Sequence, residues 1–309
     1  MSKFLIKRLL ALIPVCLGVT LILFSLLYIT PGDPARLALG DDASEESVTQ
    51  FRKEHGLDKP FFVRYGLFLY NAVVHQDLGR SYTTNRPVVQ EIVNTFPTTL
   101  VLASGATGLA IIFGVLFGII CAIKQYTIFD NVTMVIAMLG ISMPNFYLGV
   151  LLLLFFSVNL RWFPSSGFET MSQRILPWVC LSTTSMSIIT RMTRSSMLEV
   201  IRSDYIRTAR AKGQKESVVI FRHALKNALI PIITIAGIQF GHLLGGSILT
   251  ESIFSISGVG RLAVEAIKTR DYPIVQGAVI YMALAYVVIN LLVDLLYAWA
   301  DPRLRTRYR

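Results

Sequence analysis

Three stretches of this chain continue without a charged side chain for longer than a soluble core helix requires. They cover residues 98–123, 131–160 and 228–250, which are 26, 30 and 23 residues long. A helix of about 20 apolar residues spans a lipid bilayer. Each stretch therefore predicts a membrane-spanning helix, and the low share of charged residues, 16%, agrees with this reading.

Further apolar runs cover residues 9–30 and 272–293, and a weaker one covers 175–190. The weaker run is rich in Ser and Thr, whose hydroxyls can donate to carbonyls of the preceding turn or to a neighbouring helix. We expect Arg191 and Arg194 at its end to reach the lipid headgroups. The first run is longer than the apolar part of a signal peptide and predicts a retained helix. The chain is therefore predicted to be an all-α integral membrane protein with six transmembrane helices.

The distribution of Lys and Arg predicts the orientation of these helices. With six spans, both termini lie on one side, and the short loops of that side carry 17 Lys and Arg against 5 on the other. The side richer in cations is the cytoplasmic one. Both termini are thus expected in the cytoplasm of a bacterial cell, and the net charge of +10 is explained by these loops and adjacent anionic lipid. Binding of nucleic acid is the alternative reading of that charge.

The chain divides into four predicted parts. Within the external part, the stretch "DDASEESVTQFRKEHG" predicts a short helix that stops at Gly56, and residues 60–74 are apolar enough to lie on the membrane surface. The four parts are an N-terminal transmembrane helix (1–30), an external segment (31–97), a transmembrane domain (98–300) and a basic cytoplasmic tail (301–309).

Polar residues inside two predicted spans are candidates for a passage through the membrane. Pro144 in "GISMPNFYLG" breaks a helix at membrane depth, next to Ser142 and Asn145. In the span before residue 250, Gln239 and His242 share a face. In both places the alternative is structural: a packing kink, or polar groups that join helices.

Several kinds of chemistry are not indicated by the sequence. It contains no phosphate-binding P-loop, no H-E-x-x-H and no nucleophile elbow. The four histidines are scattered, and the three cysteines fall inside apolar runs, so no metal site is expected. Charged residues are nearly missing from the spans, which argues against an ion-driven carrier. The protein is therefore expected to be no enzyme and to take its energy from another protein.

The segment "DYIRTARAKGQKESVVIFRHALKNALIP" places many cations and a glycine between two apolar runs. Residues 204–212 predict a short helix that Gly213 ends in a left-handed conformation. A second helix is expected to bury Val218, Phe221 or Arg222, Leu225 and Leu229, which recur at intervals of three and four. This pattern fits either an amphipathic helix on lipid or a handle held by another protein.

The same segment resembles the coupling loop of ABC importer permeases. Arg207, Thr208 and Ala209 stand where that family has Glu-Ala-Ala, and Gly213 stands at the motif glycine. The acidic first residue is missing. Other stretches, among them "GISMPNF", "DLGRSY" and "GGSILTESIFSISGVGRL", are similar to the first of the two permeases of dipeptide, oligopeptide, glutathione and nickel importers. Ser257 replaces the usual proline of that outer loop.

The resemblance implies a type I (MetI-like) importer permease fold with an external segment between helices 1 and 2. It implies a second homologous permease subunit, two ATPase subunits that bind ATP and Mg, and an extracytoplasmic solute-binding protein, while this chain binds no cofactor. The substrate would be di- or oligopeptides or glutathione; a nickel or metal-chelate importer and an ion-coupled secondary carrier are the alternatives.

Roles for individual residues follow from the resemblance for the coupling loop, and from the polar residues within the spans for the passage. ATP-driven movement would enter through the loop 204–223, and Ser142, Asn145 and Gln239 would line the passage. The expected contacts with the ATPase are Arg207, Thr208, Ala209, Arg210, Ala211, Lys212 and Gly213. The expected contacts with the binding protein are Phe254, Gly258 and Gly260.

Overall fold

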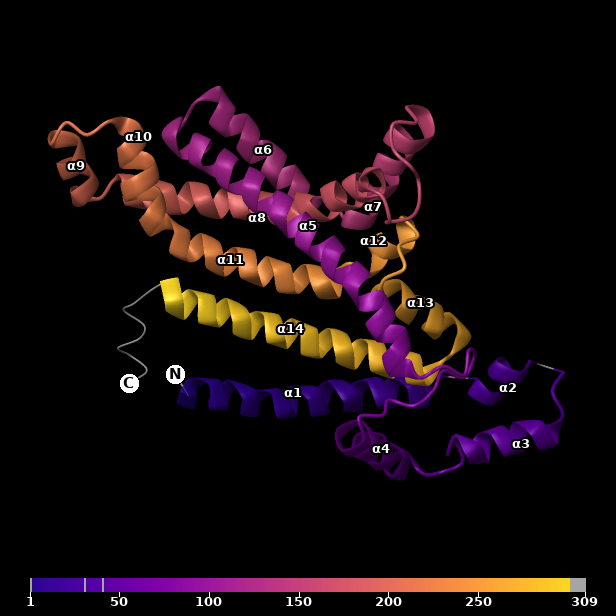
Figure 1. Ribbon diagram of the computed structural model, residues 1–309. Helices are drawn as coiled ribbons and strands as arrows, with labels where there is room; N and C mark the ends of the chain where they lie inside the picture. Colours follow the sequence, from indigo (N-terminus) through magenta and orange to yellow (C-terminus); the bar gives the residue numbers. More distant parts are fainter. Residues whose placement is uncertain (1, 31, 41, 301–309) are drawn as a thin grey trace. The chain divides into compact units, whose positions relative to one another are not determined.

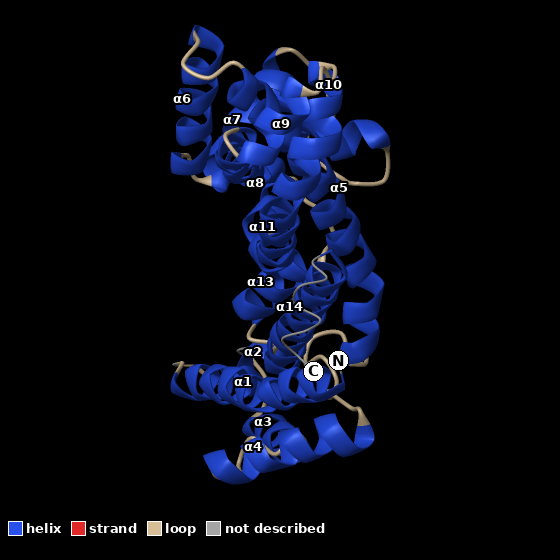
Figure 2. Ribbon diagram, turned by 90° about the vertical axis from the view of Figure 1, so that its left-hand side faces the viewer, coloured by secondary structure: helices blue, strands red, loops and turns tan. Residues whose placement is uncertain are grey.

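The computed structural model describes residues 2–30, 32–40 and 42–300, and nearly all of them are helical (Figure 1). The described residues contain no strand; one isolated bridge joins Arg80 and Pro87 (Figure 2). The chain forms two compact units. Of the described residues, unit 1 holds 100–256 and 286–300, and unit 2 holds the described part of 2–99 together with 257–285.

Unit 1 is organised around one long helix, α8. This helix packs against α6, α7, α11 and α12, all within the same unit. Two helices, α5 and α14, continue from unit 2 into unit 1. The elements of unit 1 are the second part of α5 (Val88–Ile123), α6 (Ile128–Ser142), α7 (Asn145–Leu152), the π-helical η2 (Leu153–Asn159), α8 (Met171–Ile201), α9 (Asp204–Ala211), α10 (Glu216–Val218), the π-helical η3 (Val219–Ala224), α11 (Leu225–Gly246), α12 (Ile248–Ile253) and the end of α14 (Tyr272–Ala300).

Most hydroxyl groups on helix α8 have an acceptor, whereas the buried hydroxyl of Thr193 has no partner among the described residues. Ser182 and Thr183 donate to the carbonyl of Val179 in the preceding turn. Thr184 donates to Asn145 Oδ1 on α7 at 2.9 Å, and Ser185 donates to Gln239 Oε1 on α11 at 3.2 Å. Both kinds of bond expected from the sequence are confirmed. They remove the cost of placing unpaired hydroxyls in an apolar surrounding.

The uncharged run 131–160 forms two helical segments, as a broken span or a re-entrant loop would, and no single continuous helix. Its two halves, α6 and α7–η2, are bent by 104° at Met143 and Pro144. Pro144 cannot donate a backbone hydrogen bond, so α6 ends before it and α7 starts after it. The sequence predicted the position of the break and underestimated its angle.

An ion pair fixes the start of α6 to α8. Arg194 Nε and Nη2 donate to the two carboxylate oxygens of Asp130 at 2.6 and 2.7 Å. Asp130 is buried and also accepts from the backbone N–H of Tyr126. The expectation that Arg194 reaches the headgroups is therefore wrong, because a buried carboxylate offers a fixed, two-pronged partner.

Unit 2 joins the N-terminal helix and the external segment to residues 257–285. Asp271 links its distant parts: the carboxylate accepts from the Ser81 and Thr83 hydroxyls and from the Tyr82 backbone N–H. The elements are α1 (Ser2–Ile29), α2 (Pro34–Leu39), α3 (Glu45–Glu54), α4 (Phe61–Tyr70), the π-helical η1 (Asn71–His75), the start of α5, α13 (Val259–Thr269) and the start of α14. Helix α3 has the predicted stop at Gly56, whose φ is +62°.

By the length and composition of its helices, the structure supports part of the prediction of six spans. Among the described residues, three helices are long and apolar enough to cross a membrane, and a fourth is obtained if α6 and α7–η2 count as one span. Helix α1 contributes an apolar part at Ile13–Ile29, and α8 is long but rich in hydroxyls. Helix α5 starts at Val88, inside the predicted external segment. The six-span count and the domain limits stay predictions.

Close packing of α5 on α8 yields the first prediction. A Cβ added at Gly118 would clash with Thr193 and lie 2.8 Å from the carbonyl oxygen of Thr190. Backbone atoms cannot move aside, so Gly118→Ala should lower the free energy of unfolding by about 1–3 kcal/mol. The measurement is thermal unfolding of the purified protein in detergent. Gly108→Ala on the same helix is the matched control, because nothing lies within 4 Å of that Cβ. Equal melting temperatures of the two variants would contradict the packing of α5 on α8.

Candidate coupling hairpin, pathway residues and outer loop

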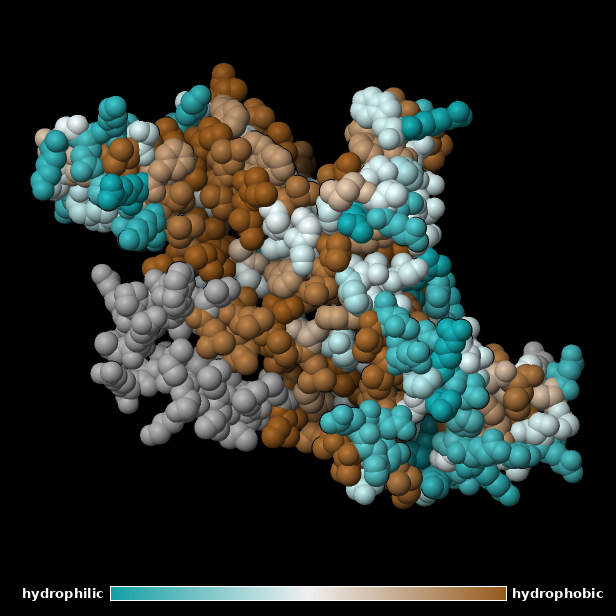
Figure 3. Space-filling model, in the orientation of Figure 1, coloured by the Kyte–Doolittle hydropathy of each residue, from teal (hydrophilic) through white to brown (hydrophobic). Residues whose placement is uncertain are grey.

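The segment between α8 and α11 folds into a helical hairpin, which we call the coupling hairpin (residues 204–223). Helix α9 begins after Ser203 and ends at Ala211, one residue before the predicted end at residue 212. The hairpin forms a hydrophilic end at the upper left of Figure 3, next to the apolar surface of the long helices of unit 1. Its first helix is anchored by Ile206, which is fully buried.

Gly213 ends α9 in the left-handed conformation that the sequence predicted, with a φ of +71°. The N–H of Gly213 donates to the carbonyl of Arg210 at 2.9 Å, and the N–H of Gln214 donates to that of Ala209 at 3.4 Å. These two bonds form a Schellman motif, which satisfies the last carbonyls of the helix. A residue with a side chain would be strained here because of φ alone, since nothing lies within 4 Å of an added Cβ.

An ion pair closes the hairpin on the far side of the turn. Arg210 Nε and Nη2 donate to the carboxylate of Glu216 at 3.1 and 2.6 Å. These hydrogen bonds hold the pKa of the Glu216 carboxyl below its ordinary value, although slight desolvation acts in the opposite direction. Within the hairpin, His223 Nε2 also bonds to Gln214 Oε1 at 2.7 Å. The amide of Asn227 at the start of α11 donates to the Tyr205 hydroxyl of α9.

The second half of the hairpin buries a different face from the predicted one. Buried positions are Val219, Ile220, Ala224 and Ala228, whereas Phe221 is 60% exposed. Of the predicted positions, Val218, Leu225 and Leu229 are only partly buried and Arg222 is exposed. The cause is the π-helical η3, whose wider turn shifts the face by one residue relative to a regular α-helix.

The predicted ATPase contacts lie together on the hairpin and are accessible. Ala209 is half-buried against the core that contains Ile206. The remaining residues are exposed, namely Arg207, Thr208, Arg210, Ala211, Lys212 and Gly213. Arg207 forms a loose ion pair with Asp204 at 3.8 Å, and both side chains are exposed to solvent. The hairpin therefore offers cations to a partner on a surface fixed from below by apolar packing.

The predicted pathway residues differ in exposure. Ser142 at the end of α6 is exposed, and Asn145 at the start of α7 is half-buried with its side chain bonded to Thr184. Gln239 is buried, with 9% of its surface exposed, and accepts from Ser185. Gln239 thus fits best the alternative stated above, a polar group that joins two helices. Sequence reasoning missed Thr184 and Ser185 as individual partners; the signal was their polarity within an apolar run.

The predicted contacts with the binding protein are buried. Phe254, in unit 1, is 1% exposed and accepts a backbone bond from Gly167; Gly258 and Gly260, in unit 2, are also buried. The expectation for these three residues needs correction, because a surface partner would contact their exposed neighbours. Among these neighbours are Ser255 and Ser257.

Two family descriptions match this sequence and together cover most of it. Residues 114–306 match the family described as "Binding-protein-dependent transport system inner membrane component". Residues 1–103 match the N-terminal family of the same membrane components.

Among the described residues, no group of three or more His, Cys, Asp or Glu could hold a metal ion.

Curated relatives are similar over the whole chain. The dipeptide transport system permease protein of Alkalihalophilus pseudofirmus is 44% identical, over 99% of this chain and 100% of the relative. The glutathione transport system permease protein of Pectobacterium atrosepticum is also 44% identical, over 99% of each chain.

Solved structures show the same fold at low sequence identity. A chain of the inward-facing MetNI methionine ABC transporter superposes with a TM-score of 0.56 at 18% identity, over 69% of this chain and 97% of that one. A chain of an amino acid ABC transporter superposes with a TM-score of 0.52 at 17% identity, over 70% and 94%. The fold is thus the MetI-like fold of ABC importer permeases. With two matching family descriptions and relatives at 44% identity, the chain belongs to the inner membrane components of binding-protein-dependent transport systems.

Proposed function

We propose that this chain is the permease subunit of an ATP-driven importer that moves peptides, either di- and oligopeptides or glutathione, across the cytoplasmic membrane. The observation that carries the proposal is the coupling hairpin: an exposed, cationic helix, capped at Gly213, on an apolar anchor. The names of the relatives, a dipeptide and a glutathione permease, support the substrate class.

The proposed assembly contains a second permease subunit, two ATPases that bind ATP and Mg, and an external solute-binding protein. This chain would perform no catalysis and bind no cofactor. Both termini and the hairpin would face the cytoplasm, and residues 31–97 would face outward. The division into an N-terminal helix (1–30), external segment, permease domain (98–300) and basic tail (301–309) belongs to the same proposal.

The hairpin would transmit movement through its buried side. Ile206 of α9 belongs to one apolar cluster with Met197 of α8 and Ala228 of α11. Packed side chains are not compressible enough to absorb a displacement. When closure of the ATPases moves α9, the adjoining ends of α8 and α11 would therefore move with it, which changes access to the passage.

The hairpin proposal is tested by Gly213→Val. A β-branched residue is strongly disfavoured at a φ of +71°, so α9 loses its cap and ATP-dependent uptake should fall at least tenfold. The measurement is uptake into proteoliposomes that contain all partner subunits. Labelled dipeptides, longer peptides, glutathione and nickel are offered separately, which also decides the substrate.

The matched control is Gly213→Asn, because asparagine tolerates left-handed backbone and should retain most of the uptake. Membrane insertion of both variants is compared by their yield in the membrane fraction. Wild-type uptake by Gly213→Val would contradict a role of the hairpin in coupling.

The proposed passage is tested by cysteine accessibility in a background without the three native cysteines. Ser142→Cys should react with a water-soluble thiol reagent, because Ser142 is exposed beside the break in the helix. Gln239→Cys should react at least tenfold more slowly, because Gln239 is buried between α11 and α8. Protection of Ser142→Cys by transported peptide would support its position in the passage. Equal reaction rates at the two positions would contradict the assignment.

A further inference from the structure

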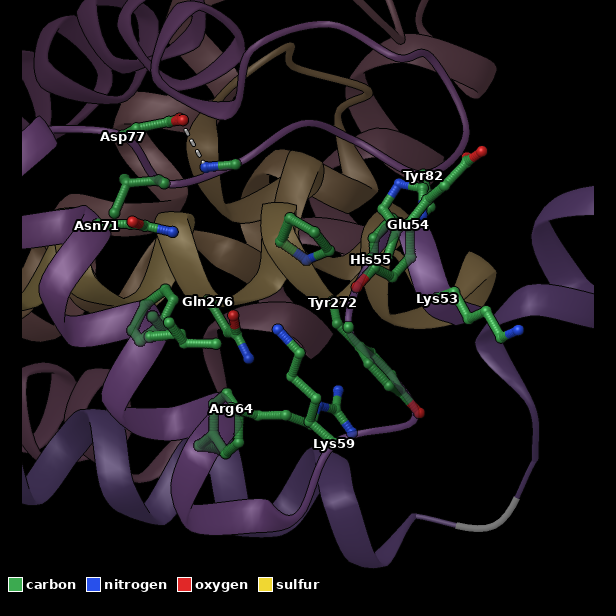
Figure 4. A pocket seen from close by; sticks show the side chains of 17 residues that line it. Lys53, Glu54, His55, Lys59, Arg64, Asn71, Asp77, Tyr82, Tyr272 and Gln276 are labelled. Atoms are coloured by element: carbon green, nitrogen blue, oxygen red, sulfur yellow. Dashed lines mark hydrogen bonds between the residues drawn. The ribbon is translucent and has the colours of Figure 1, made fainter. Parts of the chain in front are cut away.

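Unit 2 contains a polar cavity that the transport proposal does not use. Its volume is about 290 Å³, and it lies among α3, α4 and the start of α14 (Figure 4). Charged and polar side chains line it together with aromatic rings. Those labelled in Figure 4 are Lys53, Glu54, His55, Lys59, Arg64, Asn71, Asp77, Tyr82, Tyr272 and Gln276.

The polar cavity is lined by three Lys or Arg residues and two carboxylates, and each carboxylate accepts a hydrogen bond from an uncharged donor. Glu54 accepts from the amide of Gln50 at 2.9 Å, and Asp77 accepts from the N–H of Gly79 at 2.8 Å. Within the described part of the chain, Lys59 and Arg64 have no carboxylate within ion-pair distance. Figure 4 shows these two side chains reaching the same part of the cavity, on the side of Gln276, while Glu54 extends away.

A second cavity adjoins the first and is almost entirely apolar. Its volume is about 450 Å³, and it lies among α1, α4, η1, α5 and α14 in the same unit. Phe68 and Leu78 belong to the walls of both cavities. The rest of the apolar cavity is lined by residues such as Leu17, Ala72 and Tyr281. A ligand that occupies both cavities must therefore carry an anionic group at one end and hydrocarbon at the other.

Helix α4 indicates that this pair of cavities lies at a membrane surface. Its inner side is held on α1: the Tyr65 hydroxyl bonds to Thr20, and the ring of Phe61 packs edge-on against Phe24. Its outer side exposes large apolar side chains, with Phe62 80% and Val63 48% exposed. A helix with such a face is stable where the face enters the interfacial layer of a bilayer.

We propose that the two cavities hold one anionic phospholipid, with its phosphate beside Lys59 and Arg64 and an acyl chain in the apolar cavity. Charge complementarity selects an anionic headgroup over a zwitterionic one, because each Lys or Arg near the surface adds attraction to anionic lipid. The bound lipid fastens α4 to α1 and α14, and so fixes the external segment on the membrane. This site is independent of what is transported.

The test is native mass spectrometry of the full-length protein, purified in detergent and supplied with equal amounts of phosphatidylglycerol and phosphatidylcholine. The wild type should retain phosphatidylglycerol preferentially, and Arg64→Gln should reduce this preference about fivefold, as expected for one cation. Ala72→Phe fills the apolar cavity without a change of charge and should reduce retention of both lipids.

Lys268→Gln is the matched control. It removes one exposed cation from α13 in the same unit, away from both cavities, and should leave the preference unchanged. Because Arg64 also lies over the ring of Phe24, its loss could disturb folding. Lys59→Gln changes an exposed side chain instead and should also lower the preference, with an unchanged melting temperature.

Three results would overturn the proposal. The first is equal retention of the two lipids by the wild type. The second is displacement of phosphatidylglycerol by millimolar inorganic phosphate, which would identify a site for a free anion. The third is unchanged lipid retention in Arg64→Gln and Lys59→Gln together with lost binding of the solute-binding protein, which would identify a site for protein docking.

Discussion

The arrangement of unit 1 depends on how α8 satisfies its hydroxyl groups. A helix within a bilayer leaves a buried polar side chain unpaired only at a cost in free energy, since no water is there to replace the missing partner. The hydroxyls of α8 therefore fix which helices pack against it. Thr184 donates to Asn145 of α7, and Ser185 donates to Gln239 of α11. Adjacent residues on a helix point in different directions, so these two bonds hold two different neighbours. The Asp130–Arg194 pair adds a third neighbour, α6.

The same helix connects the membrane part to the coupling hairpin. Ile189 and Met197 of α8 belong to the apolar cluster that includes Ile206 of α9 and Val219 of η3. The hairpin is thus packed into the apolar core of unit 1 and is not a loosely attached loop, although its outer surface is hydrophilic. Its stiffness comes from three local features: the Schellman motif at Gly213, the two-pronged Arg210–Glu216 pair and the buried Ile206. A partner that binds the exposed residues therefore acts on the long helices directly.

The sequence predicts best those structural features that depend on single residues, such as helix ends and breaks. The end of α9 at Gly213 and the break at Pro144 follow from the backbone preferences of single residues, and both were located correctly. The buried face of η3 was not, because a π-helical turn arises from tertiary packing and leaves no period in the sequence. The partner of Arg194, Asp130, is 64 residues away in the chain, so the sequence pattern indicated only lipid headgroups as a partner. The burial of Phe254 likewise depends on helices that are distant in sequence.

The break between α6 and α7 shows that packing and passage are not opposed explanations for the same residues. A broken helix exposes carbonyls, and α8 provides donors on one side: Thr184 bonds to the Gly140 carbonyl, and the Cys180 thiol bonds to that of Asn145. Ser142, by contrast, is exposed, and its hydroxyl returns to the carbonyl of Met138. One face of the break is thus closed by protein, while Ser142 on the other face is exposed. The polar contacts with α8 hold the two helices at a fixed angle, and under the proposed function the exposed face of the break would border the passage.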